Sequence, residues 1–427
     1  MKVPGEHGKL LIGYLVMFGV FITAIAVTAL SCSGTIHREA RLLEAARHLE
    51  EGKAAWGRGD IQVAWQGFQS AVEADPSNPE VRGYRAYFLT TVAEATADPK
   101  VQKAARDVAH ADYQFIIQAD PEGKFAALAR DALAVLEDRI LFPEREFPCS
   151  EAARKQQAQA HQLFMAGRYR AATPHYQKAI ELCPHNAHIW VEYGHALFLV
   201  GDFDRSKTLL LEGLKKDEWN RAGHRFLADL EAALGNLEMA YQIAILAVVS
   251  DPVYESGWSL LRDITNGMRG QWNRVVNQRP SVSLARDGNP QVILPFDTKK
   301  TPAGDVVFWL GLGLTEASEL KEARTRPVPT QEEVGRSPLD KERQRVEKNL
   351  AYCRFVIAKD PSKDSKIFRI IEDAQKAGFL TEAIFIHLMD KRIADEYIQF
   401  RKKHRDRLVE YIKTMVAPTG PMRKVPS

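Results

Sequence analysis

Histidine and cysteine are the residue types in this chain that could bind a metal or carry redox chemistry. Five histidines crowd the middle of the 427-residue sequence: His161, His175, His185, His188 and His195. None of them forms an i, i+4 pair backed by a carboxylate, as a helical zinc site requires. We therefore expect these side chains to be solvated or to lie in a binding groove, and we expect no metal and no cofactor.

The cysteines lack the C-x-x-C spacing of zinc and thioredoxin-type sites. Cys149 directly precedes the first helix of a predicted helix pair, and Cys183 ends the second helix. Antiparallel helices bring such ends together, so one hypothesis is a Cys149–Cys183 disulfide. It would be stable only in an oxidising compartment. The alternative is a pair of free thiols.

Motifs of known catalytic machinery do not occur in a usable context, including G-x-S-x-G, H-E-x-x-H, Walker A and G-x-G-x-x-G. Gly311-Leu312-Gly313 lacks both a third glycine and a preceding strand. The formal net charge of +3 is too near neutral to imply a nucleic-acid partner. We predict that the protein is not an enzyme and does not bind nucleic acid.

A turn signal recurs at a fixed interval of 34 residues, beginning at Gly167, Gly201 and Gly235. Small and large apolar residues follow the first turn at regular offsets, as Ala172, Tyr176 and Ala179, and similar positions follow the third. The helix before the second turn carries the tryptophan, glycine and leucine of a known motif: Trp190, Gly194 and Leu197. The stretch 150–252 therefore resembles the tetratricopeptide repeat family. This resemblance implies an all-α, right-handed solenoid of helix-turn-helix pairs, whose concave surface binds protein partners.

The rest of the chain is divided by its local patterns. Val282-Ser283-Leu284 and Val292-Ile293-Leu294 flank turn residues, which predicts a small β-hairpin inside a helical protein. That insertion is either a lid or partner contact, or an ordered loop that merely packs. We predict these parts: 1–31, membrane anchor or lipoprotein signal; 37–148, degenerate repeats; 150–253, core repeats; 254–302, insertion with the hairpin; 303–415, degenerate helical repeats; 416–427, disordered tail.

The last predicted helix, about 394–415, is amphipathic and would cap the solenoid. Its basic run, 401–405 with Arg407, has two interpretations. One is a surface for anionic lipid or an acidic partner, and the other is a solvated helix face.

The N-terminus contains 21 uncharged residues, 10–30, enough for a helix of roughly 32 Å, which matches a hydrocarbon core. The following Leu30-Ser31-Cys32-Ser33-Gly34 resembles a lipoprotein cleavage box with Cys32 as the lipidated residue, except that Ala29 stands where leucine is usual. The alternatives are an uncleaved anchor, a lipoprotein and an anchored cytoplasmic protein. We expect a membrane-tethered protein on the periplasmic side of a bacterial envelope.

The family resemblance also implies which side chains face a partner, because the inner helix of each pair lines the concave surface. Chaperone-binding members grip a carboxylate with Lys and Asn, where this sequence has Gln, His and Val. A carboxylate clamp is therefore not expected, and the mixed surface suits an extended or helical segment with apolar anchors. The alternative is a groove filled by the protein's own hairpin or a neighbouring helix. The predicted groove residues are Lys53, Trp56, Gln157, His161, Phe164, Val191, His195, Phe198, Arg225 and Asp229.

Together these patterns predict a membrane-tethered interaction scaffold, as a structural or assembly subunit of a bacterial envelope complex of the secretion, pilus, flagellar or outer-membrane kind. An accessory subunit of a membrane enzyme complex is the alternative.

Overall fold

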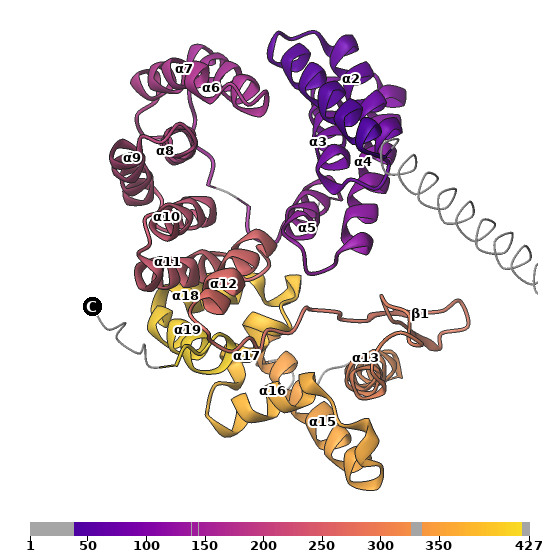
Figure 1. Ribbon diagram of the computed structural model, residues 1–427. Helices are drawn as coiled ribbons and strands as arrows, with labels where there is room; N and C mark the ends of the chain where they lie inside the picture. Colours follow the sequence, from indigo (N-terminus) through magenta and orange to yellow (C-terminus); the bar gives the residue numbers. More distant parts are fainter. Residues whose placement is uncertain (1–37, 138, 144, 326–334, 421–427) are drawn as a thin grey trace, which may run out of the picture. The chain divides into compact units, whose positions relative to one another are not determined.

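The computed structural model describes residues 38–137, 139–143, 145–325 and 335–420 (Figure 1). The predicted membrane segment and Cys32 lie outside these residues. Within them, no helix combines the length and apolar character needed to cross a membrane. The described chain forms two compact units: residues up to Leu136 together with His161–Arg168, and Glu137–Ala160 together with Tyr169 onward.

The first unit is a set of helices joined by short turns. Side chains of Asp60, Asn78 and Asp98 accept hydrogen bonds from the first free backbone N–H groups, so each begins a helix. Tight packing of Phe68, Phe88 and other apolar side chains makes the core. Residues 38–57 are helical, followed by α2 (Ile61–Ala74), α3 (Pro79–Ala95), α4 (Pro99–Ala119) and α5 (Lys124–Leu136).

The second unit starts with the 34-residue repeats, whose helices follow one another as a stack from α7 to α12 (Figure 1). The predicted turns are confirmed: Gly201 and Gly235 have φ of 86° and 81°, a backbone region that glycine adopts without strain. The helices are α6 (Glu151–Met165), whose end from His161 belongs to the first unit, α7 (Tyr169–Leu182), α8 (Ala187–Leu199), α9 (Phe203–Lys216), α10 (Arg221–Ala233), α11 (Leu237–Ser250) and α12 (Glu255–Gly267).

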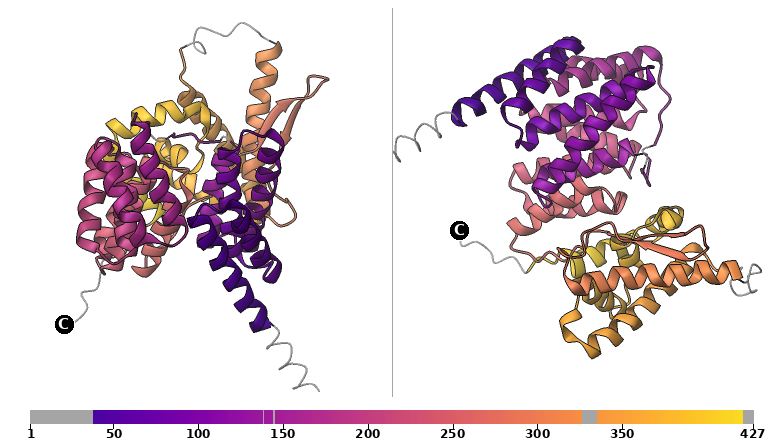
Figure 2. Two further views of the ribbon diagram at one scale, coloured as in Figure 1. Left: turned by 90° about the horizontal axis from the view of Figure 1, so that it is seen from above. Right: turned by 90° about the vertical axis from the view of Figure 1, so that its right-hand side faces the viewer.

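A hairpin and a helical end complete the second unit. Strands β1 (Ser281–Leu284) and β2 (Pro290–Ile293) pair antiparallel where the hairpin is predicted, and they pack against α13 (Figure 2). Gly313 of α13 leaves room there, since a Cβ at this position would lie 2.6 Å from Val292 Cγ1. The remaining elements are α13 (Ala303–Thr325), α15 (Pro338–Lys359), η1 (Pro361–Lys363), α16 (Lys366–Lys376), α17 (Leu380–His387), η2 (Lys391–Ile393), α18 (Ala394–Lys403), α19 (Arg405–Tyr411) and η3 (Ile412–Val416). The all-α solenoid is thus the observed fold class, with little strand.

Two predictions for the C-terminus are wrong. The single closing helix is broken at His404, and the break directs Leu408 and Tyr411 of α19 into the core. The tail does not begin at 416, because Val416 and Ala417 are fully buried. Their carbonyl oxygens accept hydrogen bonds from Asn273 N and from the Tyr241 hydroxyl, which holds this segment in the fold.

A buried ion cluster holds the segment after α12 to the C-terminal helices. The guanidinium of Arg279 donates to Glu342 at 2.6 Å and to Glu316 at 3.0 Å, and its Nε lies 3.6 Å from Asp390. Burial disfavours the charged form of Arg279, but the Glu342 carboxylate outweighs it and leaves the pKa raised. Arg279 therefore joins α13, α15 and the turn before η2.

Arg279→Met should lower the free energy of unfolding by about 3 kcal/mol, because it leaves buried carboxylates without their central cation. Arg343→Met is the matched control, since the Arg343–Glu347 pair is exposed and contributes about 0.5 kcal/mol or less. Urea unfolding followed by tryptophan fluorescence measures both. Equal losses in the two variants would contradict a structural role for the cluster.

Candidate functional site

The first unit contains an apolar groove of about 380 Å³, here called the tyrosine groove. Side chains of α3, α4 and α5 line it, together with Met165 of α6. Phe125 and Leu128 are exposed large apolar side chains at its edge. The groove is lined by Glu80, Gly83, Tyr84, Tyr87, Tyr113, Ile116, Phe125, Leu128, Ala129, Ala132 and Met165.

Three of the predicted groove residues converge on two of these tyrosines. The Lys53 ammonium lies 4.1 Å from the ring centre of Tyr84, and the Tyr87 hydroxyl is 2.7 Å from His161 Nε2. The Trp56 ring packs 5.8 Å from Tyr87 but is only 4% exposed. Trp56 therefore supports the groove from the core and offers no surface to a partner.

Lys53 keeps its charge at this position. Burial pulls its pKa down, yet the hydrogen bond to Glu50 and the neighbouring Tyr84 together leave the pKa raised. An ion pair, Lys53 with Glu50 at 2.9 Å, thus lies next to Tyr84 of this aromatic and aliphatic groove. Such a site suits an apolar side chain of a partner with polar groups next to it.

The other predicted groove residues do not line the tyrosine groove. Phe164 is half-buried near the end of α6 in the first unit. In the second unit, Gln157 donates to Glu192 at 3.0 Å, which links α6 to α8. Val191 is only 2% exposed and packs with Leu210, so it belongs to the core and not to a surface.

Aromatic rings of α8 and α10 form a stack around His195. Its ring lies 3.7 Å from Phe226 with an interplanar angle of 13°, and Phe198 follows at 6.4 Å. Arg225 and Asp229 form an ion pair one turn apart on α10. Burial and the charge of Arg225 lower the pKa of His195 to about 3, so this imidazole is neutral near pH 7.

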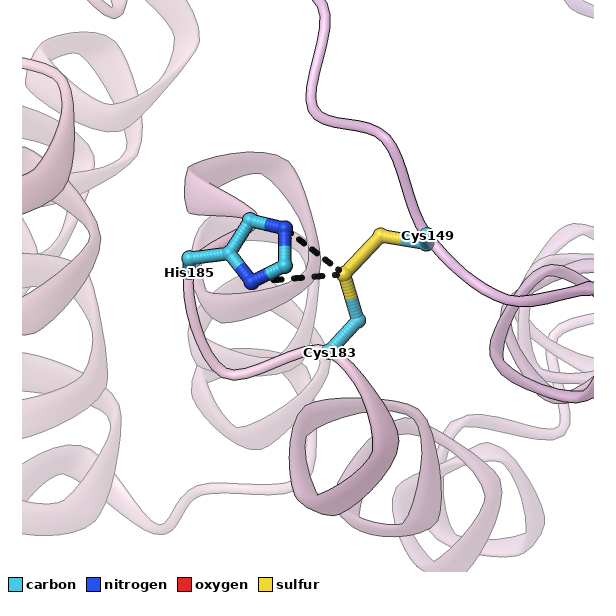
Figure 3. Close-up of side chains that lie close together, drawn as sticks. All are labelled: Cys149, Cys183 and His185. Carbon is cyan, nitrogen blue, oxygen red and sulfur yellow. Dashed lines mark hydrogen bonds between the residues drawn. A yellow bond between two sulfur atoms is a disulfide. The ribbon is translucent and has the colours of Figure 1, made fainter.

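Cys149 and Cys183 form a disulfide, with their Cα atoms 5.6 Å apart (Figure 3). His185 faces this bond, with Nε2 3.5 Å from Cys183 Sγ and 2.9 Å from the Pro148 oxygen. These three side chains are spaced as metal ligands could be. Metal binding needs thiolates, however, and both sulfurs share one covalent bond. The cluster therefore acts as a covalent clamp.

The three arginines of the basic run near the C-terminus contact other residues of the protein. Arg401 is buried and lies 4.6 Å from the ring centre of Trp219, and Arg405 stacks on the same ring. Arg407 pairs with the buried Glu382 at 2.6 Å. Lys402 and Lys403 are exposed, and the side chains of Arg405 and Arg407 remain 38% and 49% exposed, as the solvated-face interpretation expects. The buried Arg401 fits neither sequence interpretation.

Sequence reasoning missed the residues that make the tyrosine groove. Tyr84 and Tyr87 stand three residues apart, which places both on one helix face. That spacing could have identified them, but their repeat lacks the 34-residue period. A second omission is the extended segment before α6, which carries no periodic signal.

Comparison with known proteins identifies the central repeats. Residues 163–230 match the tetratricopeptide repeat family. No curated protein matches the chain. This match confirms the resemblance for residues 163–230, from the end of α6 to α10.

Several solved structures of tetratricopeptide repeat proteins are similar to the chain at low sequence identity. The TPR domain of P58(IPK) is 16% identical, covering 87% of this chain and 99% of that one, with a TM-score of 0.24. The TPR2AB domain of yeast Sti1, in complex with pHSP90, is 16% identical. The match covers 52% of this chain and 96% of that one, with a TM-score of 0.25. PilF of Pseudomonas aeruginosa is 13% identical, covering 54% of this chain and 92% of that one, with a TM-score of 0.22.

His195 should make the second unit less stable in mild acid. Its folded pKa lies below the ordinary value of about 6.5, so between pH 6.5 and about 3 the unfolded chain binds a proton that the folded chain does not. From pH 7 to pH 5, wild type should lose about 1 to 2 kcal/mol more unfolding free energy than His195→Phe, which keeps an aromatic ring in the stack.

Urea unfolding of both proteins at pH 8, 7 and 5 measures this difference. Between pH 8 and 7 the two proteins should change in parallel, because His195 is then almost neutral in either state. A parallel change down to pH 5 would show that His195 is protonated equally in the folded and unfolded chain.

Proposed function

We propose that this protein is a membrane-tethered scaffold that binds a protein partner through the tyrosine groove, within a bacterial envelope complex. Tetratricopeptide repeats at residues 163–230 support a scaffold role, because stacked helix pairs present extended binding surfaces. The catalytic motifs searched for in the sequence do not occur in a usable context. The membrane and envelope parts of the proposal rest on the apolar residues 10–30 and on Cys32.

The tyrosine groove is the observation that carries the binding proposal. Tyr84, Tyr87 and Phe125 provide large, rigid, partly polar contact surfaces, a type enriched at protein interfaces. The groove is wide enough for one or two large apolar side chains, at about 380 Å³. Its occupant would therefore be a protein segment with aromatic or aliphatic anchors.

Leu128→Asp should weaken partner binding by a factor of 30 or more, roughly 2 kcal/mol, because it places a charge where an apolar anchor is buried. The matched control is Val135→Asp, which lies on the same helix, is also exposed and does not line the groove. Affinity purification from the native host in mild detergent, with quantification of each co-purifying chain, measures the difference.

Thermal unfolding of both variants is compared first, so that loss of partner is not loss of fold. Unchanged recovery of every partner by a folded Leu128→Asp protein would remove the tyrosine groove from the proposal. Recovery of the protein alone, with turnover of a small substrate, would instead favour a catalytic role.

The mode of tethering has a separate test. A lipoprotein would begin at Cys32 with acyl groups, and Cys32→Ala would leave the precursor uncut. An uncleaved anchor would keep residues 1–31. Intact mass of the membrane-extracted protein distinguishes the two, and we expect one of these masses. Wild-type protein recovered in the soluble fraction after cell lysis would contradict tethering itself.

A further inference from the structure

Residues 139–143 and 145–149 form an irregular, extended segment, here called the strap. It belongs to the second unit and runs past the starts of α10 and α8 toward α6 (Figure 1). Three of its backbone carbonyls accept hydrogen bonds from side chains of those helix starts. Phe142 O accepts from Arg221 Nη1 at 2.9 Å, Arg145 O from His188 Nε2 at 3.0 Å, and Pro148 O from His185 Nε2 at 2.9 Å.

The accepting carbonyls are spaced three residues apart. A polyproline II helix has three residues per turn and no internal hydrogen bonds, so it presents every third carbonyl in the same direction. Phe-Pro occurs twice in the strap, at Phe142-Pro143 and Phe147-Pro148. The side chains at or just before the starts of α8 and α10 bind these regularly spaced carbonyls, which is also how a proline-containing ligand is recognised.

Aromatic contacts anchor the strap at both Phe-Pro pairs. Phe142 is 5% exposed and packs edge-on against Tyr397 of α18, at 5.4 Å between ring centres. The guanidinium of Arg401 lies 5.9 Å from the same ring. Phe147 contacts the ring of His188 edge-on at 5.5 Å. The anchoring surface is thus built jointly by the repeats and by α18.

We infer that this surface is a binding groove for an extended protein segment with a Phe-Pro anchor, and that the strap occupies it as a built-in ligand. The Cys149–Cys183 disulfide fixes the strap at its end and keeps it in place. A partner segment of the same chemistry binds when the strap is displaced. This groove is separate from the tyrosine groove of the first unit, and the inference does not depend on the proposed function.

Opening the disulfide weakens the hold of the strap. A dithiol reductant supplies two electrons and two protons, forms its own intramolecular S–S bond and leaves Cys149 and Cys183 as thiols. Cys149 is the more accessible of the two, because it is half-buried while Cys183 is fully buried. Only noncovalent contacts then hold the strap: the rings of Phe142 and Phe147 and the three hydrogen-bonded carbonyls.

The experiment uses the full chain in detergent and a labelled peptide of residues 139–150 carrying Cys149→Ser. Its binding is measured by fluorescence anisotropy against two proteins: the oxidised wild type, and a released variant with Phe142→Ala and Cys149→Ser. We expect the released variant to bind the peptide at least about tenfold more tightly than the wild type, because its groove is free. Addition of Arg221→Ala to the released variant, or Phe142→Ala in the peptide, should reverse this gain.

Val135→Asp in the released variant is the matched control, and it should leave peptide binding unchanged because Val135 is exposed and lines neither groove. Circular dichroism establishes that each variant is folded. If the released variant does not fold, Cys149→Ser alone and dithiol-treated wild type replace it, with the same expected gain. Equal binding to oxidised and opened proteins, or equal binding of the Phe142→Ala peptide, would overturn the inference and leave the strap as an ordinary packed linker.

Discussion

The close approach of the two helices in each pair is the constraint on which the fold depends. A Cβ at Gly194 would lie 2.7 Å from Leu210 Cγ, and one at Gly52 would lie 2.9 Å from the Phe68 ring. Both distances are shorter than real contacts, so only glycine permits this separation. A large side chain of the second helix fills the space over each glycine. Because this contact recurs in both units, it aligns the helix pairs and leaves the opposite faces of the inner helices for other uses.

Local signals made much of this fold predictable. Glycine turns with positive φ, the hairpin around Asp287-Gly288 and the start of α15 at Ser337-Pro338 each depend on a few adjacent residues. The disulfide hypothesis also followed from local geometry, since helix ends of one pair must meet. The broken closing helix was not predictable, because the direction of α19 is set by packing with residues far away in sequence.

The candidate groove was predictable only in part, for a similar reason. A 34-residue period predicts on which face of its helix Val191 lies, but it does not predict how far the side chain is buried. Gly213 and Gly223 leave space for the Val191 side chain: a Cβ would lie 2.8 Å from Val191 Cγ2 at Gly213 and 3.1 Å from it at Gly223. Val191 is therefore buried in the core. The strap escaped prediction because its hydrogen-bond partners lie 37 to 79 residues away along the chain, and Tyr397 lies farther still. Contacts of that kind follow from tertiary packing and leave no repeating pattern in the sequence.

The C-terminal helices do more than cover the end of the repeats. Every α-helix ends with carbonyls that lack intrahelical partners, and at α11 these are satisfied by α18: Tyr397 donates to Val249 O at 2.6 Å, and Arg401 donates to Ser250 O. The positive charge of Arg401 also complements the negative end of the α11 dipole. The same two side chains contact the Phe142 ring. Tyr397 and Arg401 are therefore held in position by their hydrogen bonds to the end of α11. Because both side chains also contact Phe142, the packing of α18 against α11 creates the site that anchors the strap.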